Sequence, residues 1–483
     1  MTVTTKDPLY VSLAHTLHEL VTQGVWQPGE RVPSLRHLSR EHRVSLSTAF
    51  QTYTYLENKG VLEARPRSGY FVRPRAHPAP APSAPTLSAT TGAEVRISEQ
   101  LAAVLEAQAG HHAPFAVAVP SLALLPVARL QKAVTKVLRA AAGPSVGYEL
   151  TVGNALLRRQ IAQQAPRWGG TLTADDLIIT SGCLEALNLC LRAVTRPGDT
   201  VAVESPTYYG LLQSLENLGL KALEIATHPQ TGVDLDELEA AFQRQPVAAC
   251  LFVPTFNNPL GSCLSDDKKQ QLVTLLTRWA VPLIEDDIYG ELYFGPARPK
   301  ACKAFDTEGW VLLCSSFSKQ LAPGYRVGWI AASGRFRAQL ERLKFMHNLA
   351  TATLPQLAVS EFLAHGRYDH HLRQLRAAFA AQVQQTTQAI YRYFPAGTRV
   401  TQPSGGFVLW VELPDARDAF ELHRQALRQG IGFVPGPLFS AQPRYRNCLR
   451  ITCGQPWSPD LEQSLGVLGG IAQQLLPSPR DVA

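Results

Sequence analysis

The neighbours of one lysine suggest chemistry. Lys319 lies in "SSFSKQLAPGYRVGW", with Ser316 and Ser318 just before it and Arg326 seven residues after it. The flanking runs "WVLLC" and "VGWIAA" each predict a short buried strand, so we expect Lys319 on the connecting loop. A lysine is nucleophilic when its free amine is populated near neutral pH, which requires burial or nearby positive charge. A phosphorylated aldehyde is one ligand that would use all four groups, since the lysine would bond its carbon and the others its phosphate.

An isolated S-x-S-K segment would favour an ordinary solvated lysine on a surface loop. Other segments supply the remaining groups that such an aldehyde requires. "ITSGCLEALNLCLRAV" places Gly182 between a strand and a helix, where backbone N–H groups can cradle phosphate. "ESPTYYG" supplies Tyr208 to stack on a flat ring, and "PTFNNPLG" supplies Asn258. "LIEDDIYGELYF" supplies Asp286, which would keep a pyridine nitrogen protonated, and Tyr289, which with Asn258 would bond a ring hydroxyl.

This order of segments resembles the fold-type I aminotransferases that depend on pyridoxal 5'-phosphate, over roughly residues 99–483. The resemblance implies that Lys319 is the Schiff-base lysine and that Asp286 pairs with the pyridinium nitrogen. It assigns Asn258 and Tyr289 to the ring oxygen and Tyr208 to stacking on the ring. The implied phosphate ligands are Gly182, Cys183, Ser316, Ser318 and Arg326. In "GCLEAL", Cys183 and Leu184 replace a polar pair that is common in the family, so phosphate binding there would depend more on backbone N–H groups.

Two further segments fit the same resemblance. "GYELTVGNALLRRQIA" matches the family segment in which Tyr148 would reach the phosphate of the neighbouring subunit, which implies a homodimer. "NCLRITCG" places Arg450 where the family binds a substrate carboxylate, a task that suits a planar bidentate guanidinium. Arg450 alone would be equally compatible with a residue on a surface strand.

The first 75 residues differ from the rest, since they hold ten Lys and Arg against six Asp and Glu and so contribute +4 of the net charge of +7. Leu13, Leu17 and Leu20 fall on one stripe of a helix that Gly24 ends. Ser34 and Ser45 are good N-caps for two more helices, to about Glu41 and to Gly60, and "VLEARPRSGYFV" predicts a β-hairpin. In the third helix Ala49, Tyr53 and Leu56 share a face. Three helices and a basic hairpin predict a winged helix-turn-helix that binds DNA; a small protein-binding module is the alternative.

This segment resembles the DNA-binding domain of the GntR regulators, through "PLY", "PGERVPSLRHLS", "VSLSTAFQTYTYLENKG" and "SGYFV". Where the family often has arginine, this chain has Leu46, which would either reduce base reading or join the apolar stripe of the helix. Hydroxyl, amide and cationic side chains would contact bases and phosphates. The candidate DNA-binding residues are Arg36, Arg43, Ser45, Ser47, Thr48, Gln51, Lys59, Arg65 and Arg67.

The chain of 483 residues is long enough for several domains. We expect a winged helix-turn-helix domain (α+β) at 1–73, a Pro- and Ala-rich linker at 74–98, and an α/β aminotransferase-like domain at 99–483 with a mostly parallel central sheet. Within it we expect a large subdomain at about 146–345 and a smaller α+β subdomain at about 99–145 and 346–483. The eight cysteines form no CxxC pair, so we expect neither a metal site nor disulfides. With no secretory signal or membrane-spanning run, we expect a cytoplasmic protein.

A GntR-like reader joined to an aminotransferase-like domain resembles the MocR subfamily of transcription regulators, over the whole chain. The resemblance implies a dimer that binds a double-stranded DNA operator and senses a small amino compound, or pyridoxal 5'-phosphate itself, at Lys319. One alternative is an active aminotransferase that also binds DNA, because Lys319, Asp286, Tyr289 and Arg450 are all present. Another is a dimerisation scaffold that has lost its cofactor.

Overall fold

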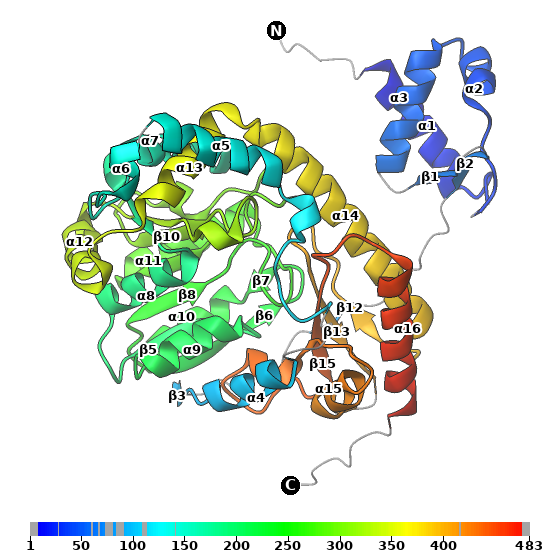
Figure 1. Cartoon of the computed structure of the whole chain (residues 1–483). Helices are drawn as coiled ribbons and strands as arrows, with labels where there is room; N and C mark the ends of the chain where they lie inside the picture. Colours follow the sequence, from blue (N-terminus) through cyan, green and yellow to red (C-terminus); the bar gives the residue numbers. More distant parts are fainter. Residues whose placement is uncertain are drawn as a thin grey trace. The chain divides into compact units, whose positions relative to one another are not determined.

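The structure is a computed structural model. It describes residues 8–27, 29–58, 61–65, 68–72, 81–83, 91–108, 114–140, 142–414 and 417–475. The chain divides into two compact units, residues 1–78 and 79–483 (Figure 1). Within the described residues, no helix is both long and apolar enough to cross a membrane.

The first unit is the winged helix-turn-helix that the sequence predicts. Its elements are α1 (Leu9–Thr22), α2 (Leu35–Glu41), α3 (Leu46–Asn58), β1 (Leu62–Arg65) and β2 (Gly69–Val72). The strands pair antiparallel, and Ala49, Tyr53 and Leu56 of α3 are buried against Leu17 of α1 and Leu38 of α2. The two expected N-caps are present, because the Ser34 hydroxyl accepts from His37 N and the Ser45 hydroxyl accepts from Thr48 N.

The second unit, which we call the body, contains in its described part a nine-stranded sheet in the order β3-β6-β5-β8-β9-β10-β11-β4, with β7 paired to β6. Strands β6, β5, β8, β9 and β10 are parallel, whereas β3, β7, β11 and β4 add antiparallel pairs at its two edges. The predicted parallel sheet therefore forms the centre of a mixed sheet. The strands are β3 (Ala93–Glu94), β4 (Leu177–Thr180), β5 (Thr200–Ser205), β6 (Lys221–His228), β7 (Gly232–Val233), β8 (Ala249–Phe252), β9 (Leu283–Asp286), β10 (Val311–Ser316) and β11 (Gly328–Ala331).

Helices cover both faces of this sheet, as expected when parallel strands are buried on both sides (Figure 1). Residues of β8 show the alternation, since Leu251 packs with α8 and α9 and its neighbours Cys250 and Phe252 pack with α10 and α11. The α-helices are α4 (Ser98–Gln108), α5 (Val127–Ala140), α6 (Ala142–Val146), α7 (Ala155–Gln164), α8 (Cys183–Val194), α9 (Tyr209–Asn217), α10 (Leu235–Arg244), α11 (Asp266–Trp279), α12 (Gly334–Asn348), α13 (Thr353–His365), α14 (Tyr368–Tyr393), α15 (Ala419–Leu427) and α16 (Pro459–Gln474). The 3₁₀ helices are η1 (Leu122–Leu124), η2 (Ala165–Trp168), η3 (Ala174–Asp176), η4 (Cys302–Phe305), η5 (Pro323–Tyr325) and η6 (Gly436–Phe439).

A second, antiparallel sheet of four described strands lies in the order β12-β13-β15-β14. Its strands are β12 (Arg399–Val400), β13 (Val408–Glu412), β14 (Val434–Pro435) and β15 (Cys448–Thr452). Side chains of this sheet share a buried cluster with residues of α14, α15 and α16. This arrangement is the smaller α+β part that we expected near the C-terminal end.

The packing differs from the expected subdivision in two places. Strand β3 and the buried side chains of Val95 and Ile97 already belong to the body, although we expected the linker to continue to residue 98. Helices α5 and α13 pack with α7 on the large sheet, because Leu130, Leu157 and Val359 share one buried cluster. We had assigned both helices to the smaller part, since periodicity shows that a helix has an apolar face but not which sheet that face meets.

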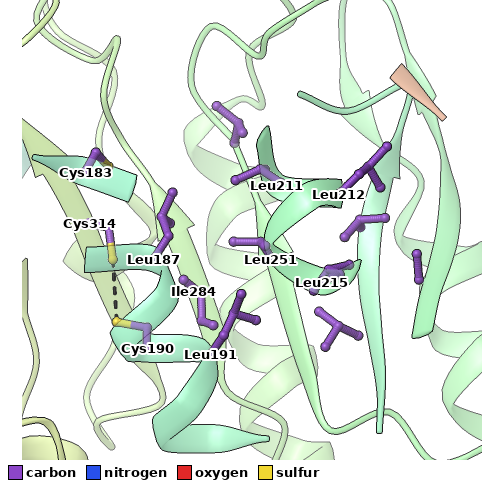
Figure 2. Close-up of a cluster of buried hydrophobic side chains, with 14 of the residues drawn as sticks. Cys183, Leu187, Cys190, Leu191, Leu211, Leu212, Leu215, Leu251, Ile284 and Cys314 are labelled. Carbon is purple, nitrogen blue, oxygen red and sulfur yellow. Dashed lines mark hydrogen bonds between the residues drawn. The ribbon is translucent and has the colours of Figure 1, made fainter. Parts of the chain in front are cut away.

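Figure 2 shows part of the core between α8, α9 and the central strands. Leu187, Leu191 and Leu215 interdigitate there with Leu251 and Ile284 of the sheet. All eight cysteines are free, and the sulfur atoms of Cys190 and Cys314 lie 3.6 Å apart. Cys183 begins α8 at the edge of this cluster, which connects the core to the site described next.

Candidate functional site

A cavity of about 270 Å³ lies where the central parallel strands end. Such carboxyl-terminal edges are the usual ligand sites of open α/β sheets, because the loops that leave neighbouring strands converge there. Its lining residues are Val117, Ala118, Val119, Cys183, Leu184, Leu187, Tyr208, Tyr209, Val253, Asn258, Asp286, Ile288, Tyr289, Ser318, Lys319 and Arg326.

Lys319 lies on the loop between β10 and β11, as the flanking apolar runs predict. Its Nζ donates to the carbonyl oxygen of Ala118 at 2.7 Å. Burial lowers the pKa of Lys319 to about 8, with a further lowering by the Arg450 charge that Asp286 partly offsets. At pH 7 roughly a tenth of this side chain is therefore the nucleophilic free amine, far more than for an exposed lysine.

Asp286 is the last residue of β9, and its side chain faces the cavity. Oδ1 accepts from Cys183 Sγ at 3.4 Å and from the Ile288 N–H at 3.1 Å. Burial raises the pKa of Asp286 to about 6, which these hydrogen bonds partly counteract. The carboxylate is therefore mostly ionised at pH 7 and able to hold a proton on a basic ring nitrogen.

Three more of the predicted ring contacts line the same cavity. Asn258 Nδ2 donates to the hydroxyl of Tyr289 at 3.3 Å, and burial raises the pKa of that tyrosine, which keeps it a neutral donor. Tyr208 is the N-cap residue of α9, and its ring centroid lies 4.5 Å from that of Tyr209. An amide, a phenol and an aromatic face thus surround the space between Asp286 and Lys319.

The start of α8 and Arg326 lie beside each other at the cavity. Gly182 is the N-cap of α8 with φ +83°, and a Cβ atom there would lie 2.2 Å from Arg326 Nη2. Arg326 Nη1 donates to the Ser318 hydroxyl at 3.3 Å, and Nη2 donates to the Ser181 carbonyl at 3.2 Å. A helix N-terminus beside a guanidinium suits a phosphate. Ser316 does not line the cavity; it is fully buried, and its hydroxyl accepts from Ser318 N at 3.2 Å, so it stabilises the turn.

Arg450 lies on β15 directly behind the cavity lining and is 0% exposed. Nη1 donates to Asn258 Oδ1 at 3.4 Å, Nη2 donates to the Ala116 carbonyl, and Nε has no partner among the described atoms. Residues 116–118 thus supply backbone acceptors to both Arg450 and Lys319. A buried guanidinium with an unsatisfied N–H retains capacity for an anionic ligand.

Tyr148 does not line the cavity of its own chain. It follows α6 and its side chain is 89% exposed. Of the predicted cofactor and substrate residues, four do not line the cavity: Gly182, Ser316, Arg450 and Tyr148. Gly182 and Arg450 lie beside lining residues, whereas Tyr148 is exposed and Ser316 is buried in the turn.

Several groups that shape this site were not predicted from the sequence. Glu204 at the end of β5 is fully buried, and it accepts from Val253 N at 2.7 Å and from Asn257 Nδ2 at 2.8 Å, which fixes the loop that carries Asn258. Burial raises the pKa of Glu204 to about 7. Phe439 lies 5.5 Å from the Arg450 guanidinium, and the segment 117–119 forms one wall. Of these groups, Glu204 begins the segment "ESPTYYG" that supplies Tyr208, whereas Phe439 and residues 117–119 lie outside the quoted motifs.

Most of the described candidate DNA-binding residues of the first unit lie on its surface. Arg36, Arg43, Ser47 and Gln51 are exposed. The Ser45 and Thr48 hydroxyls lie 2.8 Å apart at the start of α3, so both are engaged in capping that helix. Lys59 and Arg67 lie outside the described residues, and Arg65 is described only as the last residue of β1.

Two apolar side chains on α3 are exposed. Leu46 is 54% exposed and Phe50 is 52% exposed. Leu46 is therefore not part of the core, which excludes one of its two interpretations. Phe50 was missed, although it stands one turn from the exposed Leu46 on the same helix.

Two family models match the chain. Residues 9–72 match the model of the gntR family of bacterial regulatory proteins, and residues 120–463 match that of aminotransferase class I and II.

Relatives and solved structures agree with this division. YdcR and YjiR of Escherichia coli strain K12, both named uncharacterized HTH-type transcriptional regulators, are 43% and 39% identical. Those alignments cover 97% and 95% of this chain and 99% and 98% of the relatives. The kynurenine aminotransferase of Pyrococcus horikoshii, solved with PMP, superposes on 79% of this chain and 95% of its own with a TM-score of 0.74 and 27% identity. LysN of Thermus thermophilus, an alpha-aminoadipate aminotransferase solved with N-(5'-phosphopyridoxyl)-L-leucine, covers 77% and 94% with a TM-score of 0.72 and 29% identity.

Proposed function

The chain belongs to the GntR-family regulators of the MocR type, and from this we propose that it regulates transcription by coupling operator binding to a ligand in the body. The ligand is pyridoxal 5'-phosphate joined to Lys319, together with a small amino compound that exchanges with the lysine. The observation that carries the proposal is the meeting of Lys319 and Asp286 in one buried cavity of a chain that also has a winged helix.

The residues present fit this cofactor. The cavity brings together a carboxylate, an amine of lowered pKa, and a guanidinium beside a helix N-terminus. When bound, the cofactor supplies a protonated ring that withdraws electrons from an attached amine. Asp286 would hold the proton on the ring nitrogen, Asn258 and Tyr289 would bond the ring oxygen, and Tyr208 would stack. Cys183, Ser318 and Arg326 would hold the phosphate with the backbone at Gly182.

Arg450 would select the amino compound. Its guanidinium is fully buried with Nε unpartnered, so a carboxylate that displaced the Ala116 carbonyl would satisfy it. The same displacement would separate residues 116–118 from Arg450 and Lys319. This exchange of partners is a local change that a regulator can convert into a change of DNA affinity.

A homodimer completes the proposal, because Tyr148 is exposed and would reach the partner's phosphate. Large exposed apolar side chains lie on this segment and on α8 and α12. The Thr353 hydroxyl donates to the Gly147 carbonyl next to Tyr148, and Asn348 of α12 donates to Glu185 of α8. The exposed apolar side chains are Val146, Leu150, Leu184, Phe345 and Met346. A mass measurement in solution, with Phe345→Glu and Met346→Glu as the disrupting pair, tests this part.

Thermodynamic linkage tests the coupling. Operator DNA selected from a random pool would be titrated with the full chain with and without pyridoxal phosphate, and the cofactor titrated with and without that DNA. We expect the two affinity ratios to be equal and to differ from one, because linked binding is reciprocal. Ratios of one in both directions would contradict regulation through the cofactor.

Catalytic transamination is the second candidate, and the joint presence of Lys319, Asp286, Tyr289 and Arg450 at one site favours it. Mixing the loaded protein with amino acids and following keto-acid release distinguishes the two. Sustained turnover at rates of about 1 per second or more would favour the enzyme. A spectral change that stops without product would favour the sensor.

A further inference from the structure

A basic surface lies on the body, away from the cavity at Lys319. It contains three neighbouring hollows of about 780, 320 and 600 Å³, whose lining residues come mainly from α5, α7, η2, α13 and the start of α14. We call this surface the α5–α14 patch. Its cationic residues are Arg129, Lys132, Lys136, Arg139, Arg167, Arg367 and Arg373, and its acidic residues are Glu361 and Asp369.

The charge of the body is concentrated in this patch. Residues 76–483 hold 36 Lys and Arg against 33 Asp and Glu, a net charge of +3. The patch has seven of the cations and two of the anions, a net charge of +5, so the rest of these residues carry −2. Such a local excess favours a polyanionic partner rather than general solubility.

Few of these cations are neutralised. Lys136 Nζ pairs with Glu361 at 2.7 Å, and Arg167 pairs with Asp369 at 2.6 Å. Lys132, Arg139, Arg367 and Arg373 are exposed, and none of them pairs with an acidic side chain within the described residues. Arg367 has φ +57°, a left-handed conformation that glycine or asparagine adopts more easily, so no backbone preference explains an arginine between α13 and α14.

The spacing on α5 suits a regular array of phosphates. Arg129, Lys132, Lys136 and Arg139 follow each other by three, four and three residues, so they share one face of the helix. That face is about 15 Å long at 1.5 Å per residue. That length spans about four base-pair steps of 3.4 Å along the axis of duplex DNA.

We propose that the α5–α14 patch binds the phosphate backbone of duplex DNA and so adds a second, sequence-independent contact to that of the winged helix. The proposal rests on the operator binding proposed above but uses none of its residues. Phosphate contacts from the body would raise affinity through release of counterions and would add no base specificity.

Two charge-matched variants of the full, cofactor-loaded chain test it. The patch variant is Lys132→Gln, Arg139→Gln, Arg367→Gln and Arg373→Gln. The control variant is Arg192→Gln, Arg196→Gln, Lys221→Gln and Arg244→Gln, which removes four exposed cations that line none of the three hollows. Both variants lose four positive charges, so a difference in their DNA affinity reports where those charges lie. The cofactor absorption band of each confirms that the body is folded.

The measurement is the affinity for a mixed-sequence duplex of about 60 base pairs over a range of KCl concentrations. For the patch variant we expect affinity at low salt to fall by about tenfold or more and the slope of log K against log salt to become shallower by about 0.9 for each lost contact. The control variant should stay within about twofold of the unmodified chain. Equal behaviour of the two variants would overturn the proposal.

Photo-crosslinking separates direct contact from a long-range effect of charge. A photoreactive residue at position 132 should crosslink to the duplex, and the same residue at position 221 should not. Lost affinity without crosslinks from 132 would overturn the direct contact. A reader variant, Arg36→Ala with Arg43→Ala, is measured alongside. If the reader variant loses affinity and the patch variant does not, the proposal for the α5–α14 patch is wrong and the operator-binding function stands. If neither variant loses affinity, both proposals are wrong.

Discussion

The winged helix and the body place their functional side chains in opposite environments. Arg36, Arg43 and Gln51 of the winged helix are exposed, and the core beneath them is a few apolar residues. In the body, Arg450, Asp286 and Tyr289 are buried. The first unit presents groups to a large partner that completes the site, whereas the second removes groups from water so that their reactivity changes before a small ligand arrives.

The largest effect is expected from Lys319→Ala, which removes the residue through which a ligand in the body would influence DNA binding. The variant should lose the absorption band of the lysine-bound cofactor completely, because no other nucleophilic amine lines the described cavity. Its affinity for mixed-sequence DNA should change by less than about twofold, since exposed cations supply that binding. Lys268→Ala is the control. A band that persists in Lys319→Ala would place the aldehyde elsewhere.

Substitution of Arg450 should remove selectivity within the body and leave DNA binding intact. Arg450→Lys should weaken the response to amino acids by about 100-fold, on the order of 3 kcal/mol for a buried bidentate contact to a carboxylate. For each amino acid, the corresponding amine without the carboxylate serves as an internal control. The response of the variant to that amine should equal the response of the unmodified chain. Equal losses for both compounds would mean that Arg450 acts only on the structure of the site.

A smaller effect is expected on the winged helix. Leu46 and Phe50 are exposed on α3, where apolar side chains can contact the methyl groups of thymine in the major groove. Phe50→Ala should weaken binding to operator DNA selected from a random pool by about fivefold, near 1 kcal/mol of apolar contact. Replacing thymine by uracil in this DNA should lower the affinity of the unmodified chain by about the same factor. It should not lower the affinity of the Phe50→Ala variant any further. His18→Ala on α1 is the control, and additive losses would contradict the contact.

The smallest effect is a pair of opposite pH shifts. The pKa of Lys319 is lowered to about 8, so covalent attachment should accelerate as pH rises, with a midpoint near 8. The Arg450 charge lowers this pKa, so Arg450→Gln should move the midpoint up. The Asp286 charge raises it, so Asp286→Asn should move the midpoint down. Stopped-flow absorbance against pH measures both, and shifts of the same sign would mean that charge does not set the reactivity of Lys319.

Patterns in the sequence predict what is local. The loop position of Lys319, the caps at Ser34 and Ser45, and the strands that end near Asp286 and Asn258 all follow from apolar runs and turn residues. Groups that contact each other across long separations could not be predicted. Arg450 meets the Ala116 carbonyl, and Lys319 meets that of Ala118, about 334 and 201 residues away in the sequence. No periodicity encodes such pairs, because they arise only when residues 116–118 pack against β15 and against the loop that carries Lys319.

The difference between exposed and buried positions also explains where the structure departs from what residue type and spacing indicate. Leu46 fits a helical stripe by spacing, yet it is exposed, because the stripe of Ala49, Tyr53 and Leu56 alone faces α1 and α2. Ser316 has the residue type of a phosphate ligand, yet its hydroxyl faces the turn. Residue type indicates which chemistry is available, and packing decides which group is used.

Reduction and peptide mapping of the native chain tests the site most directly. The protein would be mixed with pyridoxal phosphate, reduced with borohydride, cleaved and analysed by mass spectrometry. We expect one pyridoxyl group, on the peptide that contains Lys319. A pyridoxyl group on a different lysine, or none at all, would contradict the assignment of the body as a cofactor-binding sensor.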